Sequence, residues 1–144
     1  MTGVDISPKM IDELKKTGVY DDAWVWDLSL GLPFVKKDAF DIVLAIGFLE
    51  FLKQPKILLS GVSFAMKSAG QCLASFEVYD MKKHASRTVD NPGAGFPRYL
   101  YNLEDIDSLA KASNLRINSC ENITAYISPT TGEMREYCVL SLSR

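Results

Sequence analysis

Seven consecutive residues, from Phe40 to Ile46, are apolar at every position except Asp41. A strand with one face in the core and one in water would alternate apolar and polar residues. A strand without that alternation is covered on both faces, which is typical of a central strand in a parallel sheet. Parallel neighbours need helical crossovers, so this segment predicts an α/β fold with helices on both faces of the sheet.

The rest of the chain supplies the strands and helices that such a fold requires. Further strands are expected over residues 2–5, 23–26, 72–78, 115–127 and 135–142. Helices are expected between Ser7 and Gly18, from Pro55 to near Gly70, and after Asn102. The last two strands flank the turn-rich segment 129–132, which predicts a C-terminal antiparallel hairpin. No linker or repeat divides residues 1–144, so one domain is expected.

Composition narrows the classes of partner. The net charge of −2 gives no electrostatic reason to expect nucleic acid or an anionic membrane surface. No apolar run reaches the roughly 18 residues of a membrane span, and no signal peptide is visible. The three cysteines, Cys72, Cys120 and Cys138, show no CxxC spacing. They are therefore expected to be buried free thiols in a cytoplasmic protein, and the single histidine argues against zinc.

Five stretches, taken together and in order, resemble the class I S-adenosylmethionine-dependent methyltransferases of the type 11 kind. They resemble that family's second strand and helix, its "D…LPF" loop, its fourth strand, its glycine before strand five, and its last helix. In the same order as these features, the five stretches are residues 4–10, 27–34, 40–50, 70–76 and 101–115. The resemblance implies a Rossmann-like sheet, mostly parallel with a C-terminal antiparallel hairpin, that runs from strand two to strand seven of the family.

The resemblance also implies a transferase that uses S-adenosylmethionine as co-substrate, and it assigns a cofactor site. Asp5 would accept from the ribose hydroxyls, and Ile6 would flank the adenine. Asp27 would face the adenine amino group, and the backbone amide of Leu28 would face the ring. Near the sulfonium would lie Ala45, Ile46 and Gly47.

Each of these residues also has an ordinary structural interpretation. The negative charge of Asp5 could interact favourably with the dipole of the following helix, although Ser7 is better placed to cap that helix. Ile6 could be core, Asp27 a solvent-exposed acid, and Gly47 a simple turn residue. Glu50 could act as a base, but an exposed helix acid is the favoured interpretation. The basic segment 82–98 could attract an anionic substrate, but a solvated loop is the favoured interpretation, and His84 is assigned no catalytic role.

The chain departs from the family pattern in two ways, and the lack of the first strand leaves the function open. Asn114-Leu115 stands where the family often has Gly-Phe, and the first strand with its glycine-rich loop is absent from this chain. Without that strand, the strand at 40–46 would expose a backbone edge and an apolar face. One hypothesis is therefore a methyltransferase, truncated at its N-terminus, with an unidentified acceptor and no assigned catalytic residue. A second is a catalytically dead protein of the same fold that completes its sheet with a partner chain or a second copy. A nicotinamide dehydrogenase fragment explains fewer of the motifs.

Overall fold

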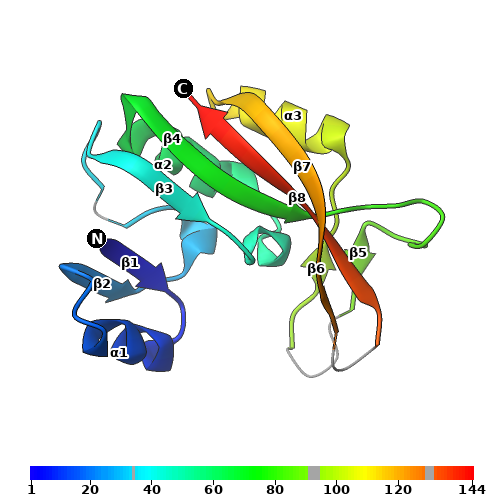
Figure 1. Ribbon diagram of the computed structural model, residues 1–144, viewed down its shortest axis with the longest axis horizontal. Coiled ribbons are helices and arrows are strands. Elements are labelled where there is room, and N and C mark those ends of the chain that lie inside the picture. Colours follow the sequence, from blue (N-terminus) through cyan, green and yellow to red (C-terminus); the bar gives the residue numbers. More distant parts are fainter. Residues whose placement is uncertain (34, 91–94, 129–131) are drawn as a thin grey trace.

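The computed structural model describes residues 1–33, 35–90, 95–128 and 132–144 of the chain. The expected alternation of strands and helices is present (Figure 1). In chain order the elements are β1 (Thr2–Asp5), α1 (Pro8–Lys16), β2 (Asp22–Val25), η1 (Leu28–Leu30), β3 (Phe40–Ala45), η2 (Leu49–Phe51), α2 (Pro55–Ala65), β4 (Met66–Glu77), β5 (Thr88–Val89), β6 (Arg98–Tyr99), α3 (Leu103–Ala112), β7 (Arg116–Ile127) and β8 (Met134–Ser143). Phe34 of the "LPF" loop and most of the hairpin turn, residues 129–131, lie outside the described residues.

The described strands form one four-stranded sheet and two strand pairs. The sheet has the order β3-β4-β8-β7, in which β3 and β4 are parallel and β8 is antiparallel to both of its neighbours. The C-terminal antiparallel hairpin is thus confirmed. β1 and β2 form a separate parallel pair, and the short strands β5 and β6 form an antiparallel pair.

The core lies between the four-stranded sheet and the helices α2 and α3. Alternate residues of β3 and β4 point into it, and the side chains of Leu58 and Ile106 meet them from the two helices. Leu28 and Leu32, which follow β2, pack against the edge of the same core. Leu32 also lies against Gly61 of α2, so this contact attaches the β1–β2 pair to the rest of the protein.

The other face of β3 is bare, contrary to the expectation that both faces are covered. Ile42 is 66% exposed and Leu44 is 61% exposed. Leu73, which neighbours Leu44 on β4, is 39% exposed. The physical reason is topological: among the described residues, β3 has β4 as its only strand neighbour, and no helix covers the Ile42 face. The exposed backbone edge and apolar face expected for this strand are therefore present.

Local signals set the helix ends. The Ser7 hydroxyl accepts from the Met10 amide at 3.4 Å, and Pro8 begins α1, as expected. Asn102 caps α3 in a reciprocal capping box with Asp105. None of the described helices is long and apolar enough to cross a membrane.

The boundary between α2 and β4 was predicted about five residues too late. α2 ends at Ala65, not near Gly70, because Met66 is already extended and pairs with Phe40 of β3. Burial favours this early start, since Met66 is completely buried. Asn114 adopts a positive φ of 56°, which asparagine tolerates better than most residues, so it can replace the family's glycine.

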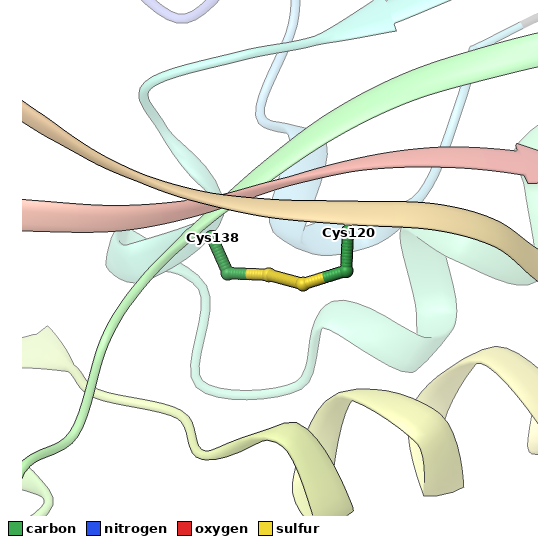
Figure 2. The surroundings of a disulfide bond; sticks show 2 residues. All are labelled: Cys120 and Cys138. Carbon is green, nitrogen blue, oxygen red and sulfur yellow. A yellow bond between two sulfur atoms is a disulfide. The ribbon is translucent and has the colours of Figure 1, made fainter.

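The expectation of three buried free thiols is wrong for two of the cysteines. Cys120 and Cys138 form a disulfide between β7 and β8, with their Cα atoms 6.3 Å apart (Figure 2). The strand register pairs Cys120 with Leu140, so Cys138 lies diagonally opposite on the same face. Cys120 is also exposed. Cys72 is a buried free thiol, as expected, and burial raises its pKa to about 12.

Candidate functional site

Two acidic side chains lie at the carboxyl ends of the parallel strands β1 and β2. Asp5 ends β1 in register with Val25, and the Trp26 amide donates to the Asp5 carbonyl at 2.9 Å. Asp27 follows Trp26 directly. Because the strands are parallel and adjacent, the two carboxylates stand at the same edge of the pair, where ligands of open α/β sheets bind.

The Asp5 side chain is oriented by the turn that leads into α1. Its Oδ1 atom accepts from the Ser7 amide at 2.7 Å, while the Ser7 hydroxyl caps the helix. That single bond leaves Oδ2 of Asp5 able to accept from a ligand. Ile6, between them, is 67% exposed, which contradicts its interpretation as core and leaves an apolar side chain beside the carboxylate.

Asp27 caps the short helix η1. Its Oδ1 atom accepts from the Ser29 amide at 2.9 Å. This hydrogen bond lowers the pKa of the Asp27 carboxyl group, so the carboxylate is ionised at neutral pH. Leu28 packs its side chain against the core, and its carbonyl accepts from the Gly31 amide at 3.1 Å. Asp27 therefore has a defined conformation, and its role toward a ligand stays a prediction.

Ala45, Ile46 and Gly47 form the carboxyl end of β3 and the turn beyond it. Ala45 is 3% exposed, whereas Ile46 is 51% exposed. Gly47 has a φ of +76° and open space where a Cβ would project, so glycine is needed for the backbone conformation rather than for lack of room. Its amide donates to the hydroxyl of Ser75 at 2.8 Å.

Ser75 is a site residue that the sequence did not reveal. The only signal for it is the parallel register, which sets Ala45 beside Ala74 and so brings Ser75 level with the turn. Ser75 is 2% exposed, and its hydroxyl fixes the direction of the Gly47 amide.

The predicted site residues fall into two groups. Asp5, Ile6, Asp27 and Leu28 lie together on the β1–β2 pair, and 45–47 lie at the end of β3. Figure 1 shows β1, β2 and β3 running in the same direction, so both groups are at carboxyl ends. No described strand pairs β1 with β3, however, and the two groups belong to separate strand assemblies.

Glu50 is buried, so its interpretation as an exposed helix acid is wrong. It is 1% exposed, and its Oε1 atom accepts from the Tyr137 hydroxyl at 2.6 Å. Burial raises the pKa of the Glu50 carboxyl group, and the neighbouring Glu77 raises it further. Burial likewise raises the pKa of Tyr137, so its hydroxyl remains a donor.

A second buried acid lies beside this pair. Glu77, the last residue of β4, forms ion pairs with Arg98 and Arg135, whose side chains are also buried. Glu77 stands opposite Tyr137 in the β4–β8 register, which brings the two acids to the same end of the sheet. The interpretation of segment 82–98 as a solvated loop is therefore wrong for Arg98, which is 5% exposed. The sequence assigned no role to Glu77 or Arg135.

The segment after β4 forms an open hollow of about 610 Å³ that is separate from the predicted cofactor residues. Two of its cations are paired: Lys83 contacts Glu136 at 2.7 Å, and Arg87 bonds Asp105. His84 accepts from the backbone amide of Asp80 at 3.1 Å and so has a structural role. These contacts agree with a folded polar surface and do not add a catalytic group.

Comparison with known structures supports the fold. A methyltransferase from Methanosarcina mazei matches with a TM-score of 0.76 and 13% identity, over 99% of this chain and 81% of that one. An S-adenosylmethionine-dependent methyltransferase from Mesorhizobium loti matches with a TM-score of 0.76 and 16% identity, over 99% and 79%. A putative methyltransferase from Haloferax volcanii, solved in complex with the Trm112 activator, matches with a TM-score of 0.75 and 15% identity, over 99% and 70%.

No curated protein matches the sequence. The family described as "Methyltransferase domain", by contrast, matches residues 1–74, which include every predicted cofactor residue. This match covers half of the chain, and it agrees with the strand order and with the structural neighbours. The chain therefore belongs to the methyltransferase domain family, within the class I S-adenosylmethionine-dependent methyltransferase superfamily.

Proposed function

We propose that the chain binds S-adenosylmethionine and takes part in methyl transfer to an acceptor that the site does not identify. Asp5 holds the ribose and Ile6 flanks the adenine. Asp27 accepts from the adenine amino group, and Leu28 supports the ring. The turn at 45–47 lies beside the sulfur. When bound, the donor supplies an activated methyl group, so the chain's residues need only bind, orient and exclude water.

The observation that carries this proposal is the pair of carboxylates at the ends of β1 and β2. Each uses one oxygen for a backbone amide, Ser7 for Asp5 and Ser29 for Asp27. Each keeps its second oxygen for a ligand. Ribose hydroxyls and the adenine amino group are hydrogen-bond donors, and carboxylates are acceptors, so the donor and acceptor chemistry fits. The open turn at Gly47 adds room at the third strand end.

Calorimetric titration with S-adenosylhomocysteine tests the proposal. We expect binding in the micromolar range that D5A weakens about tenfold to a hundredfold, since hydrogen bonds to a charged group contribute about 1.5–3 kcal/mol. D12A is the matched control, because Asp12 is an exposed acid on the adjoining helix α1. Equal affinity in D5A and D12A would contradict the role of Asp5. Tight binding of NAD instead would favour a dehydrogenase fragment.

A second candidate is a catalytically dead protein that binds a partner by completing its sheet. The observation that favours it is the bare side of β3, where Ile42 and Leu44 are exposed beside a backbone edge that pairs with no described strand. One structural neighbour was itself solved in complex with a partner chain, the Trm112 activator.

The two candidates make different predictions for the same sample. Methyl-donor binding by a monomer supports the first. A stable oligomer that binds no S-adenosylhomocysteine supports the second. Sedimentation velocity over a range of protein concentrations, with and without the ligand, separates them.

A further inference from the structure

The turn that follows β3 is held in place by polar contacts from other elements. At its start, the Gly47 amide donates to the Ser75 hydroxyl at 2.8 Å. At its end, the Tyr101 hydroxyl donates to the Leu52 carbonyl at 3.1 Å. Between these points lies η2, which carries Glu50 into the interior. The position of the Glu50 carboxyl group is therefore fixed by its surroundings.

Glu50 combines burial with an incomplete set of partners. Tyr137 donates to its Oε1 atom, but Oε2 is buried and accepts from none of the described residues. No ion pair joins Glu50 to a lysine or arginine among those residues. A buried carboxylate is costly unless it is paired, so this site favours a positive charge nearby.

The surrounding charges are already engaged elsewhere. Glu77 faces Glu50 from β4 and opposes its ionisation, while Arg98 of β6 favours it. Arg98 is bonded to Glu77, and Arg135 of β8 contacts Glu77 at 3.5 Å. Arg135 is shared with Glu133, which it contacts at 3.2 Å. Both arginines are thus paired with other acids, whereas Glu50 has no bonded cation among the described residues.

We propose that Glu50 recognises the positive charge of the sulfonium and so distinguishes the methyl donor from its neutral product. This rests on the proposed function, which has the sulfur beside Gly47. Glu50 follows Gly47 by three residues, a span of about 10 Å at most. Near a protein surface, where the effective dielectric constant is about 20, charges still interact over such a distance without contact. Loss of the sulfonium charge then weakens binding of the product, which favours its release and replacement by fresh donor.

The test compares the affinities of S-adenosylmethionine and S-adenosylhomocysteine by calorimetry at neutral pH. The variant is E50Q, which keeps an oxygen for the Tyr137 hydroxyl. The control is E121Q, an exposed acid on β7. We expect E50Q to lower the ratio of donor affinity to product affinity about tenfold, with product affinity changed less than about twofold. E121Q leaves the ratio unchanged.

A merely structural role for Glu50 would weaken both ligands equally, and that result overturns the inference while the proposed function stands. If the wild-type chain binds neither ligand, the proposed function fails and this inference fails with it. A second measurement does not depend on the variant folding. Carbon-detected NMR titration of Glu50 in the wild-type chain should show a lower pKa with the donor bound than with the product bound. Equal pKa values in the two complexes overturn the inference.

Discussion

The bare face of β3 makes a quantitative prediction about Leu44. Complete burial of a leucine side chain contributes about 1.5–3 kcal/mol. Leu44 is 61% exposed, so only about two fifths of that contribution is present. We therefore expect L44A to lower the free energy of unfolding by about 1 kcal/mol.

The matched control for Leu44 is Leu140, a strand residue that is completely buried on the central strand β8. Truncation of a buried leucine costs about 2–5 kcal/mol, because it removes contacts and leaves a cavity. Urea denaturation measures the free energy of unfolding of both variants. The two transitions are fitted with one shared dependence of that free energy on urea concentration. Measurements at two protein concentrations show whether association contributes.

The reasoning fails if L44A and L140A cost the same. That result would mean that another surface covers Leu44 in solution. If the cost of L44A also grew with protein concentration, the covering surface would be a second copy of the chain. That outcome would favour the partner-binding candidate over a monomeric donor-binding chain.

Two further predictions concern titratable groups. Because burial places the folded-state pKa of Glu50 above its unfolded value, the neutral carboxyl group contributes stability below about pH 4.3 that is lost as pH rises through the folded pKa. The stability of the wild type relative to E50Q, followed by thermal unfolding, should accordingly be greatest near pH 4 and decline toward neutrality, and a flat difference would contradict the assignment. Alkylation of the denatured, unreduced chain should label Cys72 alone, because Cys120 and Cys138 are bonded to each other. Mass spectrometry measures the labelling, and label on all three cysteines would contradict the disulfide.

The features predicted correctly from the sequence depend on short-range signals. The first strand was expected to end at Asp5, because the helix cap Ser7 follows two residues later. Ser7 and Asn102 cap helices because their side chains reach amides within the next turn. The alternation of strands and helices along the chain was also predicted, because each element carries its own apolar pattern. Each of these needs only neighbouring residues, and so the sequence was sufficient.

The features that were missed depend on distant residues. The partner of Glu50 is Tyr137, which lies 87 positions further along the chain. Nothing near Glu50 indicates that its side chain turns inward, so an exposed acid was the natural interpretation. The disulfide depends in the same way on the register of β7 against β8, because a shift of one residue would turn one cysteine to the other face.

The division of the site between two strand assemblies has a consequence for binding. The residues proposed to bind the adenosine, Asp5 and Asp27, need only β1, β2 and the turns that follow them. The residues proposed to lie beside the sulfur need β3 and, through the Glu50–Tyr137 hydrogen bond, also β8 of the four-stranded sheet. Among described contacts, the packing of Leu28 and Leu32 on α2 and its neighbours connects the two. Under the proposed function, affinity for the whole donor therefore depends on how firmly that packing holds the two groups in position relative to each other, because each group alone is already ordered by its own hydrogen bonds.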